Sequence, residues 1–399
     1  MIPRIAFVVQ RCGLEVNGGA ELHCRLVAER LSTHFATEVL TTCALDYMTW
    51  ENHYSPGVER VGELGIRRFP VARPRDVDSF NRLSASLRPR VRSAGIAEQE
   101  EWMRQQGPWS PDLFAYIRDH RADYDAFVFF TYLYATTYFG LPLVSDRAIL
   151  APLAHDEWPI YFGMWDRIFR SPRAFIFNSE EELAFLRRRF SGVQLKGPVV
   201  GVAIEPPSAL DPGAFRRTFS VAAPFVLYVG RVDESKGVGE MLRDFAAYRE
   251  SSGDEQTELV LMGQRVMRIA ERAGVRTVGF VSDADKWSAL AACEALVMPS
   301  RYESLSIALL EAWSVCKPVL VTAASEVLVG QCRRSQGGLW YSNTDEFSAA
   351  LDLLLHDERI RNGLGAQGQR FVAASYRWSR IVDAYREVIS GVTRTPGTG

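Results

Sequence analysis

The sequence lacks the patterns of a disulfide-bonded, zinc-binding or membrane-spanning protein. Its six cysteines are scattered over 399 residues without a CxxC pair, which argues against a disulfide framework and a cysteine zinc site and favours reduced thiols. No apolar run approaches the roughly 20 residues that cross a bilayer. The apolar start of the chain is too short for a signal peptide. These absences predict a cytoplasmic protein that can still touch a membrane surface.

An excess of one charge sign is also missing. The chain has 46 Lys and Arg residues against 48 Asp and Glu residues, a net charge of -2. We therefore expect no bulk electrostatic binding of nucleic acid. The hydrophobic content of 47% can build large cores, and the length favours two domains over one.

Short apolar runs alternate with longer amphipathic runs along most of the chain, which is typical of parallel sheets covered by helices on both faces. The predicted strands lie at 5–10, 38–42, 127–130, 148–154, 174–178, 199–204, 225–230, 258–263, 275–281, 295–300, 318–322 and 338–341. A stretch rich in proline interrupts the pattern after residue 205. The fold class is therefore α/β, with two doubly wound, Rossmann-like domains in series.

The predicted domain boundaries follow from this interruption. We expect a first domain at 1–205, a linker at 206–222 and a second domain at 223–375. The remainder, 376–399, is expected to be a C-terminal helix that packs back on the first domain and ends in a frayed tail.

Because ligands bind outside the carboxyl ends of parallel strands, the loops after predicted strands are the candidate sites. The first loop holds Gly18 and Gly19 before a helix. Glycines there let the backbone approach a ligand and present N–H groups to a phosphate. The loop is not a GxGxxG fingerprint, so by itself an ordinary strand-to-helix turn explains it better.

The second loop carries Arg231 and Lys236 between a strand and a helix. Two cations beside a helix N-terminus suit a diphosphate. The phosphate-loop pattern GxxxxGK[ST] is absent. The alternative is that both cations pair with Asp233 and Glu234 on the surface.

The third loop, in the stretch "RYESLSIALLEAW", sets two glutamates eight positions apart. A helix is expected to begin near 304–306, which leaves Glu303 before it and Glu311 about two turns in, roughly 12 Å along the axis. The N–H groups expected to bind an anion belong to Ser304, Leu305 and Ser306. A carboxylate at each end suits the sugar and the ribose of a nucleoside diphosphate sugar. The alternative for Glu311 is a surface pair with Lys317.

Together these three stretches resemble the retaining glycosyltransferases of the GT-B fold. The resemblance rests on the GGAE loop at 18–21, the "GR…SKG" stretch at 230–237 and the E-x7-E spacing. It implies two domains facing across a cleft, with the acceptor on the first and the donor on the second. It also implies that Arg231 and Lys236 bind the diphosphate, Glu303 the sugar and Glu311 the ribose. Many relatives have Gly-Phe after the first glutamate; here Ser-Leu-Ser follows, so the donor sugar stays open.

Residues of the first domain complete the expected site. His155 follows a predicted strand, and in similar enzymes a histidine there lies near the reacting centre; the alternative is a hydrogen-bonded loop histidine. Two adjacent acids and one histidine lack the spacing of metal ligands, so no metal or other cofactor is expected. The candidates for stacking on an acceptor are Tyr47, Trp50 and Trp158. The arginine-rich stretch at 67–92 is either a solvated face or a contact for an anionic lipid or acceptor.

The predicted function is transfer of a hexose, such as mannose or glucose, from a nucleoside diphosphate sugar. The acceptor is a hydroxyl of a glycan, glycolipid or small molecule, and the setting is polysaccharide biosynthesis. The anomeric configuration is retained and no metal takes part. Two alternatives stay open: a nucleotide-sugar 2-epimerase, which shares the architecture, and a non-catalytic subunit that binds nucleotide sugars.

Overall fold

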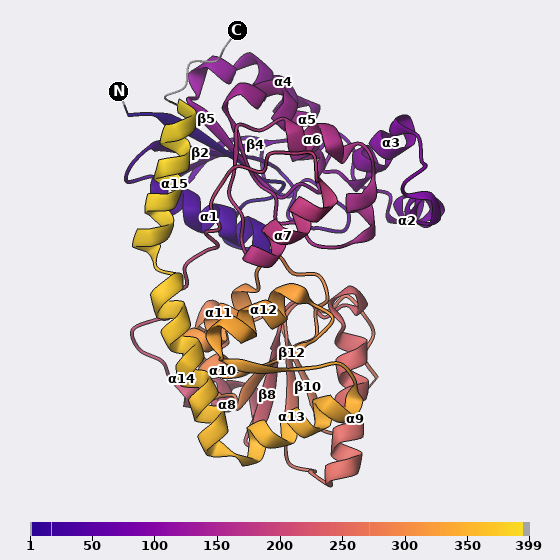
Figure 1. Ribbon diagram of the computed structural model, residues 1–399, viewed down its shortest axis with the longest axis vertical. Helices are drawn as coiled ribbons and strands as arrows, with labels where there is room; N and C mark the ends of the chain where they lie inside the picture. The colour runs from indigo at the N-terminus through magenta and orange to yellow at the C-terminus, as the bar shows by residue number, and fades with distance from the viewer. Residues whose placement is uncertain (1, 17, 271, 394–399) are drawn as a thin grey trace. The chain divides into compact units, whose positions relative to one another are not determined.

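The computed structural model describes residues 2–16, 18–270 and 272–393, which fold into two compact units. The first unit joins the chain up to Val202 with the C-terminal helix α15, and the second runs from Ala203 to Arg377. Each unit is an open parallel sheet with helices on its faces (Figure 1). Among the described residues, no helix is long and apolar enough to cross a membrane.

The sheet of the first unit has seven strands in the order β3-β4-β2-β1-β5-β6-β7. All neighbours pair in parallel except β3 and β4, which form an antiparallel edge. The strands are β1 (Arg4–Val8), β2 (Ala36–Thr42), β3 (Gly57–Val61), β4 (Leu64–Phe69), β5 (Ala126–Phe130), β6 (Ala148–Ala151) and β7 (Ala174–Phe175). The sequence patterns missed β3 and β4, because β3 is exposed along most of its length and carries no apolar run.

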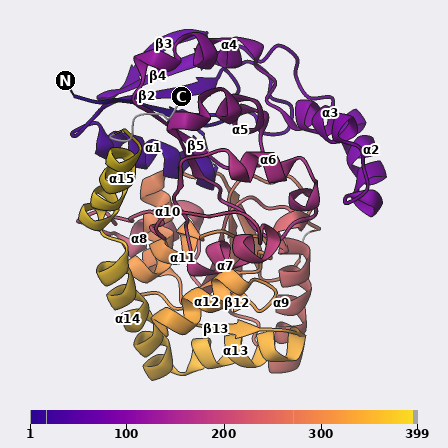
Figure 2. The same ribbon diagram turned by 45° about the horizontal axis from the view of Figure 1, so that its top comes forward.

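One predicted strand of this unit is wrong. Residues 199–204 make only an isolated bridge between Val199 and Phe177, since the preceding strand β7 is only two residues long and offers little edge for pairing. The helices of the unit are α1 (Gly19–Leu31), α2 (Val77–Leu87), α3 (Ile96–Gln106), α4 (Pro111–Asp119), α5 (Ala135–Gly140), α6 (Trp165–Arg170), α7 (Glu180–Arg189) and α15 (Trp378–Thr393). Helices α2 and α3 extend from one side of the unit (Figure 2).

The sheet of the second unit has six parallel strands in the order β10-β9-β8-β11-β12-β13. They are β8 (Phe225–Val229), β9 (Glu258–Met262), β10 (Val275–Gly279), β11 (Ala295–Met298), β12 (Val319–Thr322) and β13 (Gly338–Tyr341). The helices are α8 (Pro212–Phe219), α9 (Val238–Ser252), α10 (Asp283–Ala292), α11 (Ile307–Ser314), α12 (Glu326–Ser335), α13 (Thr344–His356) and α14 (Glu358–Ser375). Every strand predicted here is present.

The second unit begins at Ala203 and ends at Arg377, so it takes in the whole of the predicted linker. The predicted linker at 206–222 contains helix α8, which packs against α10 within the second unit. Asp211 caps this helix by accepting from the N–H groups of Gly213 and Ala214, and Phe215 is fully buried. Helix α15 packs on α1, β5 and β6 of the first unit. Of the predicted frayed tail, residues 394–399 lie outside the described part of the chain.

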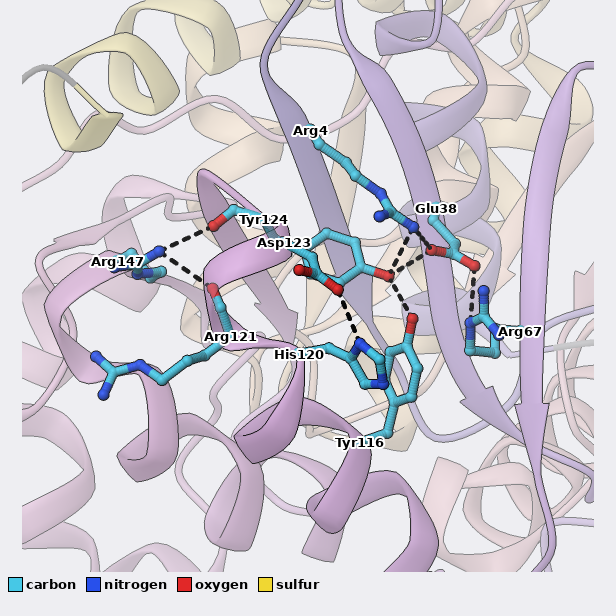
Figure 3. A network of polar contacts seen from close by, with 9 residues as sticks. All are labelled: Arg4, Glu38, Arg67, Tyr116, His120, Arg121, Asp123, Tyr124 and Arg147. Carbon is cyan, nitrogen blue, oxygen red and sulfur yellow. Dashed lines mark hydrogen bonds and ion pairs between the residues drawn. The ribbon is translucent and has the colours of Figure 1, made fainter.

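A partly buried polar network around Glu38 joins the amino ends of the strands in the first unit (Figure 3). The carboxylate of Glu38 on β2 accepts hydrogen bonds from Arg4 and Arg67, each at 2.9 Å, and from the Tyr124 hydroxyl. Tyr116 on α4 adds a hydrogen bond between the two tyrosine hydroxyls at 3.1 Å. Because ligands bind at the opposite, carboxyl ends of parallel strands, we assign this network to stability.

Candidate active site

The strand order of each unit has one position where the chain reverses direction across the sheet. In the second unit this position lies between β8 and β11, which are neighbours in the sheet but far apart in the sequence. The loops after these two strands lead into α9 and α11. Such a switch point is the usual binding crevice of an open α/β sheet.

An ion pair connects the two loops at this switch point. The Lys236 Nζ atom lies 2.9 Å from Glu303 Oε1. Lys236 ends the loop after β8, and Glu303 lies in the loop after β11. The side chains retain 32% and 14% exposure, so both can still meet a ligand. The structure thus brings together two residues that the sequence placed 67 positions apart.

Arg231 lies in the same loop as Lys236 and pairs with Asp233, Nε to Oδ2 at 2.9 Å. The backbone carbonyl of Arg231 accepts a 2.7 Å hydrogen bond from the Tyr228 hydroxyl, which comes from the buried strand β8. The surface-pairing alternative is therefore realised for Arg231, whereas Lys236 pairs with Glu303 and not with Glu234.

Two glycines let the backbones in this crevice approach closely. Gly237 has φ +76°, and a Cβ atom there would lie 2.5 Å from the carbonyl oxygen of Pro299. At Gly263, after β9, a Cβ atom would lie 2.0 Å from the carbonyl oxygen of Gly230. Contacts under 3.0 Å with backbone cannot be relieved by a side-chain movement, so both positions require glycine.

Helix α11 begins later than a start at Ser304 would place it. Its cap is Ser306, whose Oγ accepts from the N–H of Leu309. The backbone N–H groups of Leu305 and Ser306 make no hydrogen bond with another described residue. They lie just before a helix N-terminus, where the dipole favours an anion. Glu303 lies before the helix as predicted, but Glu311 is only slightly more than one turn inside it.

Glu311 has a protein partner that the sequence patterns missed. Its Oε1 atom lies 2.7 Å from Nζ of Lys286 on α10, and Glu311 is only 5% exposed. Burial raises the pKa of the Glu311 carboxyl, and Lys286 beside it opposes that shift. Burial also acts to lower the pKa of Lys286, but Glu311 raises it above its usual value. The expected alternative partner, Lys317, is therefore not the one observed, because α10 packs beside α11.

In the first unit, a buried carboxylate lies over the N-terminus of α1. Gly18 caps this helix, and a Cβ atom there would lie 1.8 Å from Oε2 of Glu21. Arg11 donates to Glu21 Oε1 from Nε at 2.9 Å and from Nη2 at 2.6 Å, and both residues are buried. A phosphate at Gly18 and Gly19 would therefore compete with Glu21 for the helix terminus.

His155 follows β6, in the loop that leaves the carboxyl end of that strand. Its Nδ1 atom lies 3.4 Å from Glu157 Oε1. A residue that the motifs missed holds this loop: Glu182 on α7 accepts from the backbone N–H of Ala154 at 2.6 Å and of Asn178 at 2.6 Å. Burial raises the pKa of Glu182 to about 8, although both backbone hydrogen bonds act to lower it. The sequence signal that could have identified Glu182 is the S-x-x-E capping pattern at 179–182. Here the glutamate accepts from Ala154 and Asn178 instead of from the backbone of the cap residue.

The aromatic candidates for acceptor binding lie in different environments. Trp50 is 1% exposed, and its Nε1–H donates to the Gln106 carbonyl at 2.8 Å. Tyr47 packs edge-on against it, with ring centroids 5.5 Å apart. Trp158 packs on Trp102 in the main core. The observed contacts of Trp50 and Trp158 are those of core residues, because their rings already have partners.

Within the described ranges, no cluster of three or more His, Cys, Asp or Glu side chains could hold a metal ion.

Residues 215–371, which make up most of the second unit, match the family described as glycosyl transferases group 1. This domain belongs to the group 1 glycosyltransferases. The match includes the Lys236–Glu303 pair and the Glu311–Lys286 pair, so the crevice between β8 and β11 lies in the family domain.

Two curated relatives resemble parts of the chain. An uncharacterized glycosyltransferase of Methanocaldococcus jannaschii is 27% identical over 180 residues, which cover 42% of this chain and 45% of the relative. The lipopolysaccharide core biosynthesis glycosyltransferase LpsE of Rhizobium meliloti is 24% identical over 186 residues, 42% of this chain and 50% of the relative. The match thus spans about half the length of these relatives.

Solved structures resemble nearly the whole chain. Sucrose-phosphate synthase from Thermosynechococcus elongatus has a TM-score of 0.72 at 17% identity, covering 98% of this chain and 100% of that one. Anabaena HepE in complex with UDP-glucose has a TM-score of 0.67 at 15% identity, covering 97% and 99%. The predicted fold class is confirmed: two Rossmann-like α/β units, as in GT-B glycosyltransferases.

Proposed function

We propose that this chain transfers a hexose from a nucleoside diphosphate sugar to a hydroxyl group with retention of the anomeric configuration. The observation that carries the proposal is the Lys236–Glu303 ion pair, 2.9 Å long, at the switch point of a group 1 glycosyltransferase domain. In such a donor the diphosphate is bonded directly to the sugar, so a cation and a carboxylate held side by side can contact these two adjacent groups. A cation suits the phosphate, and a carboxylate accepts hydrogen bonds from sugar hydroxyls.

The donor lies along the loops after β8 and β11. Arg231, Lys236 and the N–H groups at 304–306 bind the diphosphate and stabilise the charge that develops on it as it leaves, which is usually the largest catalytic term. Glu303 orients the sugar hydroxyls. Glu311 accepts from the ribose; a carboxylate has about four acceptor sites, so the bond from Lys286 leaves capacity for hydroxyl groups.

The acceptor hydroxyl attacks the anomeric carbon from the face of the leaving group. The new bond joins acceptor oxygen to anomeric carbon, the bond from that carbon to the phosphate oxygen breaks, and this oxygen takes the acceptor proton. The family resemblance assigns His155 a contact with the donor sugar, and within the first unit Glu182 anchors its loop through the backbone N–H of Ala154. The reaction as written uses no metal and no cofactor.

The comparisons support a nucleotide-sugar donor and a saccharide acceptor. HepE was solved with UDP-glucose, and LpsE is named for lipopolysaccharide core biosynthesis. A glycan or glycolipid acceptor in polysaccharide biosynthesis fits the name of LpsE.

A thermal-shift screen of UDP-, GDP- and dTDP-sugars tests donor binding. A donor at 100 times its dissociation constant adds about 2.7 kcal/mol of stability, and Lys236→Met should remove most of this gain. The donor that binds is then incubated with saccharide acceptors, and the anomeric configuration of the product is read by proton NMR. An inverted product contradicts retention. An epimer formed from donor alone indicates a 2-epimerase, and binding without turnover indicates a non-catalytic subunit.

A further inference from the structure

A cavity of about 250 Å³ opens in the first unit, away from the residues considered so far in the donor site. It lies between the loop after β4, the end of α3 and the start of the loop that follows α3. The volume is just below the range of about 300–1,000 Å³ typical of small-molecule pockets, so it suits one small ligand. Its walls hold three arginines and two tryptophans: Arg73, Arg75, Arg104, Trp50 and Trp109.

Arg75 is a half-buried cation whose hydrogen bonds all go to neutral groups. It donates to the backbone carbonyls of Gln105 at 3.2 Å, Tyr47 at 3.4 Å and Gln106. Among the described residues no carboxylate forms an ion pair with Arg75 or with Arg73. Desolvating a charge without an ion-pair partner is costly; burial lowers the pKa of Arg75, although the nearby Tyr47, Tyr134 and Asp46 act to raise it. An anion in the cavity would supply the missing charge.

The third arginine is only loosely paired. Arg104 lies 3.6 Å from Glu100 and 3.8 Å from Glu101, longer than a charge-assisted hydrogen bond. Its guanidinium also lies 5.9 Å from the centre of the Trp109 ring. The wall also carries two carboxylates, Asp76, which accepts from the Ser79 N–H, and Glu101, which accepts from the Gln105 amide, so the arginines of the wall still outnumber its acids.

A tryptophan ring completes the cavity wall. Trp109 is partly exposed and lies on the wall. Its ring packs edge-on against Phe139, with ring centroids 5.0 Å apart. Two arginines without an ion-pair partner, a third that is loosely paired and the partly exposed Trp109 ring are together suited to recognise an acidic sugar.

We infer that this pocket binds a single sugar residue that carries a phosphate or carboxylate group. In the proposed reaction this ligand is the acceptor or the terminal residue of the acceptor, and that assignment rests on the proposed function. Binding itself does not depend on it. Arg73, Arg75 and Arg104 hold the anionic group, and Trp109 covers one face of the sugar.

Calorimetry on the full-length chain without donor tests the pocket. The ligands are hexose 6-phosphates and hexuronates of the gluco, manno and galacto series, with the neutral hexoses and inorganic phosphate as controls. At least one acidic sugar should bind ten times tighter than its neutral counterpart and than inorganic phosphate. Equal binding of the neutral sugar, equal binding of phosphate alone, or no binding by any acidic sugar overturns the inference.

Variants assign the binding to this pocket. Arg73→Gln and Arg104→Gln together should weaken the acidic sugar at least tenfold with an unchanged melting temperature, whereas Arg82→Gln, an exposed arginine of α2 outside the cavity wall, should change nothing. Unchanged affinity in the double variant refutes the assignment. If acidic sugars bind through these arginines but no donor supports transfer, the proposed function fails and the pocket stands.

Discussion

Replacing Lys286 by methionine tests whether the buried Glu311 depends on its ion pair. Methionine keeps most of the length and apolar surface of lysine but removes the charge. The Nζ–Oε1 distance of 2.7 Å corresponds to a gross attraction of about 6 kcal/mol at an effective dielectric constant of 20. Much of this offsets the desolvation of the two groups. Removing one partner of a buried pair leaves the other charge uncompensated and costs about 3–5 kcal/mol.

This loss should be visible in thermal unfolding. For a domain of the size of the second unit, each kcal/mol lowers the melting temperature by roughly 2–4 °C, so Lys286→Met should lower it by roughly 6–20 °C. The matched control is Lys317→Met on the loop after α11; Lys317 makes no ion pair with Glu311 in this fold, so this change should shift the melting temperature by less than about 2 °C. Adding Glu311→Gln to Lys286→Met should recover most of the loss, because it removes the unpaired charge.

The pH dependence gives a second check with a defined sign. In Lys286→Met, burial and the nearby Asp283 both act on Glu311 in the same direction and hold its folded-state pKa above the unfolded value. The folded chain then keeps a proton that the unfolded chain releases, so stability falls as pH rises above the unfolded pKa. The variant should therefore lose more stability relative to wild type at pH 8 than at pH 5. A pH-independent loss, or a double variant as unstable as Lys286→Met, would refute the reasoning.

Other substitutions address the proposed chemistry. Arg231→Ala and Lys236→Ala should each weaken donor binding by about 1.5–3 kcal/mol in calorimetry; wild-type affinity in both would place the diphosphate elsewhere. The Glu303→Ala variant should turn over more slowly, yet it should bind free nucleoside diphosphate no more weakly than wild type, because the change releases Lys236 from its ion pair. An equal loss of affinity for the intact sugar donor and for the free diphosphate would contradict the proposed donor orientation. Turnover should persist in excess EDTA, and activity that needs added magnesium or manganese would argue against the metal-free reaction. Burial raises the pKa of Glu182 to about 8 from its ordinary 4.5, so its contribution to stability is complete below pH 4.5 and is lost as pH rises towards 8; Glu182→Gln should flatten this fall, and an unchanged pH profile would contradict it.

Some features of the fold were predictable because they depend on local patterns. Buried parallel strands are continuous apolar runs, so strands such as β1, β5, β8 and β11 were recognisable. The edge strand β3 was not, because its exposed residues carry no apolar period and it is stabilised only by pairing with β4. Helix α8 was hidden by the prolines around it, although one of them, Pro212, occupies the first turn, where proline is tolerated.

The sequence by itself determined the fold class and which loops carry the candidate donor residues, because a strand, a loop and a helix N-terminus follow one another along the chain. Tertiary structure alone decided the partners. Lys236 meets Glu303 because β8 and β11 are neighbours in the sheet, and Lys286 meets Glu311 because α10 packs beside α11. The Glu182 carboxylate accepts a hydrogen bond from the backbone N–H of Ala154, which lies in the loop after β6. Side chains far apart in sequence leave no periodic signal of their pairing, since the energy that selects each partner arises only once the chain around them has excluded water.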